Sequence, residues 1–350
     1  MKEKLIARIS RDGPLYFDDY MEACLYDPDD GFYSSGRIRP GEQADFLTSP
    51  EISPWFGVLV GGWATSEANG EVIDLVEVGA GSGALFKELD EVAGEAGIGL
   101  VGVEVSESAR RKLRKDYPDS TIVATLGEVR ESARAVVIAN ELLDNLPAAL
   151  ARKTRDGWAE LVVSSEGTVL VLEEVAARST VAAWCDAMFP NIGPGGVVTA
   201  QLAVERWIET VLRMFGTVSL CIIDYAATAE ELSARNISSL VRSYREQQTD
   251  LDWLSTPGEN DITVDVNIDG VLNVCARLGA SVVVKSQRAF LLDLGADELV
   301  ADQRDMEYLH ASGGRVMEQL MARSERIAIE ALLEEDGLGG FTVFIISRGV

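Results

Sequence analysis

Residues 74–86 read DLVEVGAGSGALF, and the fold of this 350-residue chain can be inferred from them. A short apolar run leads into three glycines, Gly79, Gly81 and Gly83, and then into a segment with helical spacing. A strand, a glycine-rich turn and a helix in this order place backbone N–H groups and the positive end of a helix dipole at the carboxyl end of the strand. The stretch therefore predicts a binding site for a polar or anionic ligand.

The spacing of the glycines narrows the choice of ligand. They follow a G-x-G-x-G pattern, whereas the dinucleotide fingerprint is G-x-G-x-x-G. No Gly-Lys-Ser/Thr sequence follows, so the turn is not a phosphate-binding P-loop. An ordinary tight turn is the alternative for an isolated glycine triplet, but here the triplet stands between a predicted strand and a predicted helix. A nucleoside site is favoured.

Short, β-branched apolar runs alternate with helical segments from residue 72 onward, which is typical of a doubly wound, mostly parallel sheet. We expect an α/β, Rossmann-like fold with seven strands, the last of them antiparallel. The predicted strands are 72–78, 99–105, 120–126, 135–141, 217–225, 280–287 and 341–349. We further expect an N-terminal helical cap over 1–70 and a main domain over 71–350 with inserted β/α lid elements at about 150–216, 228–263 and 290–336.

Composition excludes several classes of protein. With 31 basic and 57 acidic residues, the net charge is −26, which repels a nucleic-acid backbone. No apolar run approaches the roughly 20 residues that a membrane span needs. Four scattered cysteines and one histidine offer no disulfide frame and no metal site. We expect no nucleic-acid or membrane partner and a cytoplasmic location; a homodimer is compatible with the sequence.

An acid follows the second predicted strand. Glu104 lies 21 residues after Gly83, and a carboxylate at this place can accept hydrogen bonds from the two hydroxyls of a ribose. This feature occurs in both NAD and S-adenosylmethionine (SAM) enzymes. The choice between them depends on Glu77, two residues before the first glycine, because an acid followed by G-x-G-x-G resembles motif I of class I SAM-dependent methyltransferases.

Longer motifs are similar to one family. The segments GPLYFDDYMEACLYDPDDGFYSSG (13–36), DFLTSPEISPWFG (45–57) and VIANELLDNLP (137–147) resemble the MidA family, which includes mitochondrial complex I assembly factor 7. The match extends over most of the chain, in order. The resemblance implies a class I methyltransferase with SAM as cofactor, S-adenosylhomocysteine (SAH) as product and a protein arginine side chain as methyl acceptor.

The resemblance also implies roles for individual residues. The implied cofactor-binding residues are Glu77, Gly79, Ala80, Gly81, Gly83, Glu104, Thr48, Ser49 and Asn140. The implied catalytic residues are Glu141, Asp144 and Glu51. Carboxylates beside the methyl group would hold an arginine guanidinium in a bidentate manner. Asn140 and an acid after it are also typical of the start of a helix, which is the alternative interpretation of this segment.

Departures from the family motifs leave the acceptor open. Asp265 stands where the family has a histidine, and Asn267 where it has an aspartate, in a part expected to face the acceptor. A small-molecule or peptide acceptor is therefore an alternative to protein arginine, and a non-catalytic assembly factor is an alternative of another class. An NAD oxidoreductase is disfavoured by the glycine spacing. Asp224, at the end of the fifth predicted strand, could be catalytic or a plain strand-end acid, and the plain interpretation is favoured.

Overall fold

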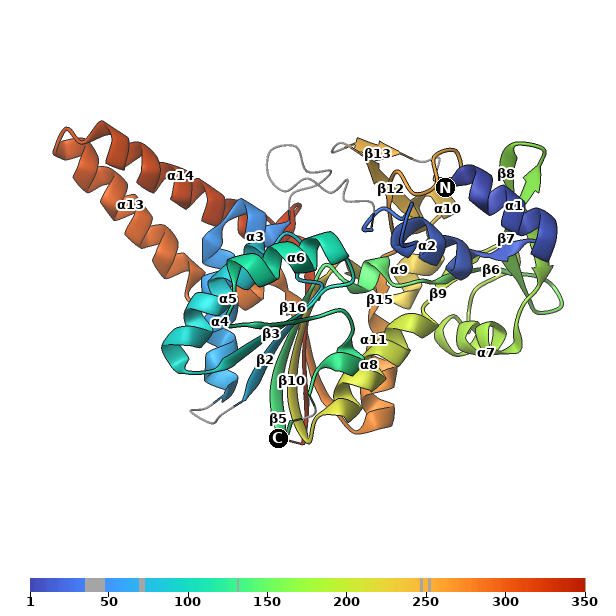
Figure 1. Ribbon diagram of the computed structural model, residues 1–350, viewed down its shortest axis with the longest axis horizontal. Coiled ribbons are helices and arrows are strands. Elements are labelled where there is room, and N and C mark those ends of the chain that lie inside the picture. The colour runs from blue at the N-terminus through green and yellow to red at the C-terminus, as the bar shows by residue number, and fades with distance from the viewer. Residues whose placement is uncertain (35–47, 69–72, 131, 246–247, 251–252, 350) are drawn as a thin grey trace.

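The computed structural model describes residues 1–34, 48–68, 73–130, 132–245, 248–250 and 253–349. The central strands are β2 (Asp74–Val78), β3 (Gly99–Val103), β4 (Thr121–Val123), β5 (Arg134–Asn140), β10 (Thr217–Asp224), β16 (Ser281–Ser286) and β17 (Thr342–Arg348). They form one sheet in the order β16-β17-β10-β5-β2-β3-β4 (Figure 1). Neighbours from β4 to β10 are parallel, and β17 is antiparallel to both β10 and β16. The predicted seven-stranded sheet with an antiparallel last strand is confirmed.

Helices cover both faces of this sheet. Successive strand residues point to opposite faces, and apolar side chains on both faces are buried under helices. Leu75 packs in one apolar cluster and its neighbour Val76 in another. Helices of the first cluster include α4 (Pro54–Ala68), α5 (Ala84–Ala96) and α12 (Gln287–Asp293), and those of the second include α8 (Leu202–Met214) and α11 (Ile268–Leu278). α6 (Glu107–Asp116) follows β3 and is shown in turquoise in Figure 1. The carboxyl ends of β2, β3 and β5 are left open between these layers.

A second, smaller sheet lies beside the first. Its strands are β1 (Leu15–Tyr16), β6 (Ala149–Lys153), β7 (Trp158–Glu166), β8 (Val169–Ala176) and β9 (Val197–Ala200), and all of its pairs are antiparallel. The chain between residues 150 and 216, where an inserted β/α element is expected, thus contains strands of this sheet. The turn between β7 and β8 contains Gly167, whose φ of 65° is open to glycine at no steric cost. α7 (Ser179–Met188) packs on this sheet.

The first 70 residues contribute to both parts of the molecule. α1 (Lys2–Asp12) and α2 (Phe17–Tyr26) pack in the apolar cluster of the smaller sheet. α3 (Ser49–Ile52) and α4 instead pack against the helices of the large sheet. The division of the chain near residue 70 stays a prediction.

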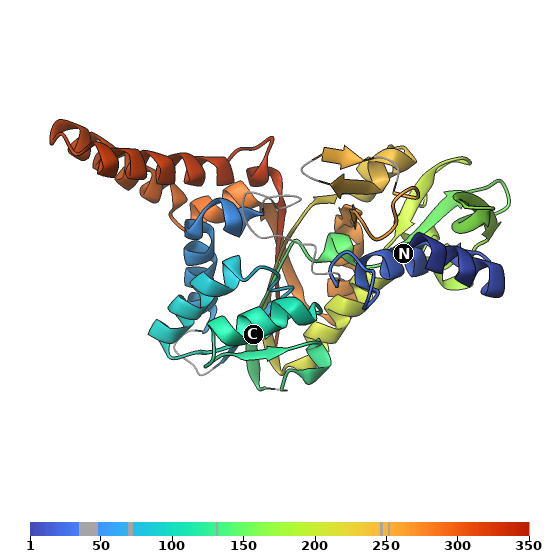
Figure 2. The same cartoon turned by 45° about the horizontal axis from the view of Figure 1, so that its top comes forward.

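Two further segments extend from the large sheet. The first contains β11 (Ala226–Ala227), α9 (Ala229–Ser233), α10 (Ile237–Leu240), β12 (Arg242–Arg245), β13 (Gln248–Asp250), β14 (Asp261–Thr263) and β15 (Val266–Asn267). The second is a helical hairpin, α13 (Ala296–Ser312) and α14 (Val316–Leu332), which projects away from the rest of the molecule in both views (Figures 1 and 2). Short 3-10 turns complete the chain at Leu126–Glu128, Leu143–Asn145 and Leu338–Gly340. No described helix is long and apolar enough to cross a membrane.

Candidate active site

A cavity of about 380 Å³ opens at the carboxyl ends of β2, β3 and β5, the edge where doubly wound sheets bind their ligands. Its volume is in the range of small-molecule and cofactor sites. The predicted site residues that line it are Thr48, Glu51, Glu77, Gly79, Ala80, Gly81, Glu104, Asn140 and Glu141. Three other predicted site residues do not line it: Gly83, Ser49 and Asp144.

The glycine turn owes its shape to backbone angles that other residues avoid. Gly79, Gly81 and Gly83 have φ values of 81°, 50° and 86°, all in the left-handed region. Space is limited as well, because a Cβ on Gly79 would lie 3.1 Å from Leu142 Cδ1 and one on Gly83 would lie 2.9 Å from Leu113 Cδ2. The conformation of the turn therefore requires glycine at these three positions. The backbone of the turn lines the cavity at Gly79 and Gly81.

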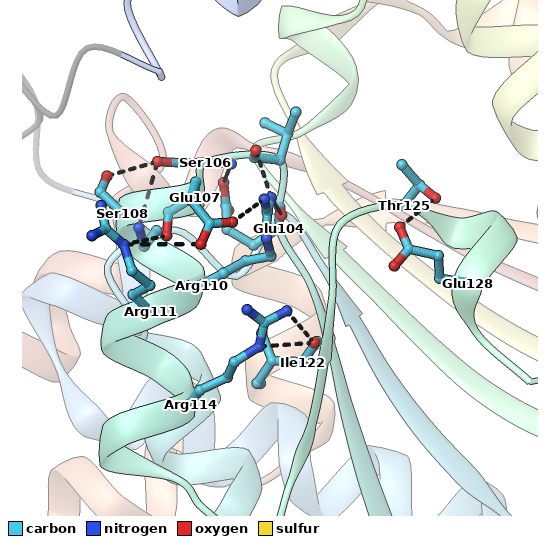
Figure 3. Close-up of polar contacts among 12 residues, drawn as sticks. Glu104, Ser106, Glu107, Ser108, Arg110, Arg111, Arg114, Ile122, Thr125 and Glu128 are labelled. Carbon is cyan, nitrogen blue, oxygen red and sulfur yellow. Dashed lines mark hydrogen bonds and ion pairs between the residues drawn. The ribbon is translucent and has the colours of Figure 1, made fainter. Parts of the chain in front are cut away.

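Glu104 is fixed at the cavity edge by backbone groups. Its Oε1 accepts a hydrogen bond from Ser106 N at 2.6 Å and its Oε2 one from Gly81 N at 2.8 Å. Arg110 Nη1 donates to the Glu104 carbonyl oxygen at 2.6 Å, and Figure 3 shows both Arg110 and Ser106 next to Glu104. Burial raises the pKa of Glu104, and the two backbone N–H groups oppose this rise. Since a carboxylate has about four acceptor positions, Glu104 can still accept two hydroxyl groups.

Glu77 lies deeper in the same cavity. It is 3% exposed, and its Oε2 has no hydrogen-bond partner among the described residues. Burial, and then the nearby Glu104, raise the pKa of Glu77 well above its ordinary value. An unpaired buried carboxyl oxygen is costly to leave unsatisfied, so a ligand with a cationic or N–H donor group fits here. The ammonium of a bound amino acid has this chemistry.

The segment from Thr48 to Glu51 lies across the glycine turn. Glu51 Oε1 accepts from Ser82 Oγ at 3.1 Å, while its Oε2 accepts from Thr48 N in a capping box at the start of α3. Both oxygens of this catalytic candidate are thus engaged by the protein. Ser49 points away from the cavity: its Oγ donates to Gln287 Oε1 at 3.1 Å.

Gln287 joins this segment to the helical hairpin. It is fully buried, and its Nε2 donates to Leu332 O at the end of α14 at 3.3 Å. One side chain therefore contacts both the Ser49 segment and the base of the hairpin.

The turn after β5 carries Asn140 and Glu141. Glu141 has a φ of 49°, and among the described residues it is the one non-glycine residue with a positive φ, a conformation that costs of order 1 kcal/mol or more. Its Oε1 accepts from Asn140 Nδ2 at 3.1 Å, and the backbone of Ser49 also hydrogen-bonds to it. Burial, followed by the charge of Asp224, raises the pKa of Glu141 to about 8. A strained acid at a cavity wall is typical of a functional residue.

Asp224 holds this turn in place. Its Oδ2 accepts from the backbone N of Leu142, Leu143 and Asp144, and its Oδ1 accepts from Tyr225 N. The sequence-based interpretation as a plain strand-end acid did not include this role: the Asp224 carboxylate stabilises the turn that bears Glu141.

Behind this turn, the large sheet meets the other segments through polar contacts. Asp144 is 3% exposed and its Oδ1 has no partner among the described residues; burial and nearby acids raise its pKa well above the ordinary value. Asn145 Nδ2 donates to Asp261 Oδ1 at 2.8 Å, and the Tyr33 hydroxyl donates to Asn145 Oδ1 at 2.8 Å. Tyr33 stacks on Tyr26 with ring centroids 5.7 Å apart, and both tyrosines and Asn145 line the cavity.

Asp265 and Asn267 do not line the cavity. Asp265 forms ion pairs with Arg235, at 2.6 Å, and with Arg242. Asn267 caps α11, since its side chain accepts from Gly270 N. Both residues are buried and tie the segment of α9–β15 to the sheet, so the expectation that they face the acceptor is not met within this cavity.

Comparison with known proteins decides the family. Residues 58–285, well over half of the chain, match the family model described as "Putative S-adenosyl-L-methionine-dependent methyltransferase". The chain belongs to the SAM-dependent methyltransferases. This methyltransferase is similar to a COG1565 superfamily member from Burkholderia thailandensis crystallised with SAH: 26% identity, a TM-score of 0.84, and coverage of 100% of this chain and 92% of that one.

Curated relatives extend the comparison. The Xenopus laevis protein named protein arginine methyltransferase NDUFAF7, mitochondrial, is 27% identical over 84% of this chain and 74% of its own length. The Bos taurus protein of the same name is 26% identical over 97% and 85%. The resemblance stated from the motifs is thus confirmed, as are the methyltransferase fold and SAM as cofactor. A cytoplasmic location stays a prediction.

Some lining residues of this methyltransferase were not assigned from the sequence. They are Tyr26, Phe32, Tyr33, Ser82, Ser106, Lys112 and Asn145. Tyr33 and Asn145 stand inside the motifs GFYSSG and ELLDNLP, so the motifs marked the right segments without showing which side chains point inward. Among the described residues, SAM would be held by Glu77, the glycine turn and Glu104.

Proposed function

We propose that this methyltransferase methylates arginine side chains of a protein. The observation that carries the proposal is the carboxyl group of Glu141 at the cavity wall, with the buried carboxyl groups of Asp144 and Asp224 next to the same turn after β5. Among the described residues, no lysine or arginine lies at ion-pair distance from any of them; Arg235 and Arg242 pair instead with Asp265. Acids without a basic partner favour a cationic acceptor, because the cation lowers the cost of ionising them. The curated relatives are named protein arginine methyltransferases, which agrees with this choice.

The residues would act mainly by alignment. SAM, when bound, supplies an already activated methyl group, so the protein has to position the acceptor and draw off charge. Glu141, at the cavity wall, can accept N–H groups of a guanidinium on its carboxylate. Tyr26 and Tyr33 offer aromatic rings to a planar cation. The Glu141 carboxylate can also take the proton that the acceptor nitrogen loses.

The acceptor can be identified by labelling. The protein is incubated with methyl-labelled SAM and a lysate of its host, and the protein and small-molecule fractions are separated. We expect label in protein, recovered as methylarginine after complete hydrolysis, and its loss with Glu141→Gln. Label in a metabolite or a peptide would instead establish the small-molecule alternative. SAH binding without any label transfer would support a non-catalytic assembly factor.

A further inference from the structure

The hairpin of α13 and α14 is the part of the molecule that the proposed function does not use. Each helix has 17 residues and is therefore about 25 Å long. The hairpin meets the body at its base, where α14 contacts α3, α4 and the 3-10 turn Leu338–Gly340 and α13 contacts α12. Its far end stands clear of the other elements in both views (Figures 1 and 2).

The two helices contact each other through a largely polar seam. Arg326 of α14 pairs with Glu307 of α13 at 3.0 Å, and also with Glu330 in its own helix at 2.8 Å. His310 and Ala322 are buried in the same seam. The exposed apolar side chains of α14 lie outside this seam.

These apolar side chains form one face of α14, which we call the α14 face. They recur at helical spacing, and each is between 50% and 68% exposed. They are Val316, Met317, Leu320, Met321 and Ile327. At about 100° per residue, Leu320 lies about half a turn from Ala322, so the face is turned away from α13. Ser324 and Ala328 lie on the same side, so the face contains no charged residue.

Charge indicates what can cover this face. Residues 304–326 contain four acidic and four basic side chains and are therefore neutral, whereas the whole chain has a net charge of −26. A basic partner would be attracted more strongly to the acidic remainder of the molecule than to this neutral part. An anionic membrane would repel the acidic protein. Two acidic molecules can associate through the neutral, apolar ends of their hairpins while their charged bodies stay apart. At that separation, salt screens the repulsion between the bodies.

We propose that the α14 face is covered by the α14 face of a second copy of this chain. Exposed patches of this kind measure roughly 300–600 Å² on one molecule. Two copies would therefore bury on the order of 1,000 Å², at the low end for a specific interface. A dimer of micromolar affinity is the expected result.

Sedimentation or light scattering on the full chain tests this proposal over about 1–100 µM. We expect the mass to rise toward twice 37.8 kDa with concentration. The variant Met317→Glu/Leu320→Glu places two charges on the α14 face and should weaken the dimer at least tenfold. Val169→Glu, at a comparably exposed apolar residue of β8 at the far end of the molecule, should leave the dimer unchanged. SAH binding by all three proteins shows that each is folded.

The proposal is overturned by a wild-type protein that stays monomeric at about 100 µM. It is also overturned by a dimer that the two α14 substitutions do not weaken relative to Val169→Glu. Monomers that sediment with phosphatidylserine-containing vesicles would show that a membrane covers the face instead.

Discussion

Asp224 Oδ2 lies 2.7 Å from the backbone nitrogen of Leu143. The same oxygen accepts from Leu142 N and Asp144 N, at 3.2 and 3.3 Å, so one carboxylate from the end of β10 fixes the turn that follows β5. Glu141 stands in that turn with a positive φ, and its neighbours hold it there. The Asp224 carboxylate thus connects the end of β10 to the turn that follows β5.

Asp224→Asn should impair methyl transfer more than cofactor binding. The amide can still accept hydrogen bonds, but it loses the charge that strengthens them, and the Glu141 turn can relax. We expect the KM for the acceptor to rise about tenfold or more and the SAH dissociation constant to change less than threefold, measured by steady-state kinetics and calorimetry. Asp224→Glu, which keeps the charge, serves as the conservative control and should retain more activity than Asp224→Asn. Equal losses of SAH and acceptor binding would contradict a role specific to the turn.

Glu104→Ala should weaken SAM binding by about 1–3 kcal/mol, because charge-assisted hydrogen bonds to the ribose are lost. Glu107→Ala is the matched control: Glu107 is exposed on α6 and pairs with Arg110, outside the cavity lining. Calorimetric titration with SAH measures both variants. Unchanged affinity in Glu104→Ala would refute the ribose assignment.

The raised pKa of Glu141 makes the stability of the free protein depend on pH. The carboxyl is protonated in the folded protein up to about pH 8 but ionises near its ordinary pKa when unfolded. The folded state therefore binds more protons between these values, and its stability falls as pH rises through that window. Glu141→Gln should remove part of this fall, on the order of a few kcal/mol, in urea unfolding at pH 5.5 and 8.5. Identical slopes for wild type and variant would show that Glu141 titrates normally.

The same group predicts a pH dependence of activity. A cationic acceptor pairs with the ionised Glu141, so kcat/KM should rise with pH toward about 8 in the wild type. In Glu141→Gln this limb should be absent and the remaining activity low. A wild-type profile that is flat between pH 6 and 9 would remove Glu141 from the reaction.

Tyr33→Phe tests the aromatic wall of the cavity. The hydroxyl of Tyr33 lies 2.8 Å from Asn145 Oδ1 and 3.1 Å from Asp261 Oδ1, and its single proton can be donated to either oxygen. Its removal takes one donor out of this buried network. We expect several-fold weaker acceptor binding with SAH affinity retained. Tyr26→Phe, whose hydroxyl instead donates to the Asn145 carbonyl oxygen at 3.1 Å, separates the effect of the side-chain network from that of the ring stack.

Sequence patterns predicted the large sheet because its strands are buried on both faces and appear as apolar runs; β5 and β10 are the clearest cases. They also predicted the glycine turn, whose three positive φ values leave little choice of residue. The polar cluster of Tyr33, Asn145 and Asp261 could not be found in this way. Its members come from three segments that are brought together by long-range packing, which local spacing does not encode.

The buried amide of Gln287 connects the hairpin to the segment from Thr48 to Glu51, since it hydrogen-bonds with Ser49 and with Leu332. If two copies join through α14, association and cofactor binding share this connection. Thermodynamic reciprocity then applies: any factor by which SAM changes the dimer constant is the factor by which dimerisation changes the affinity for SAM. Measuring the dimer dissociation constant at several SAM concentrations would give the coupling free energy between dimerisation and SAM binding.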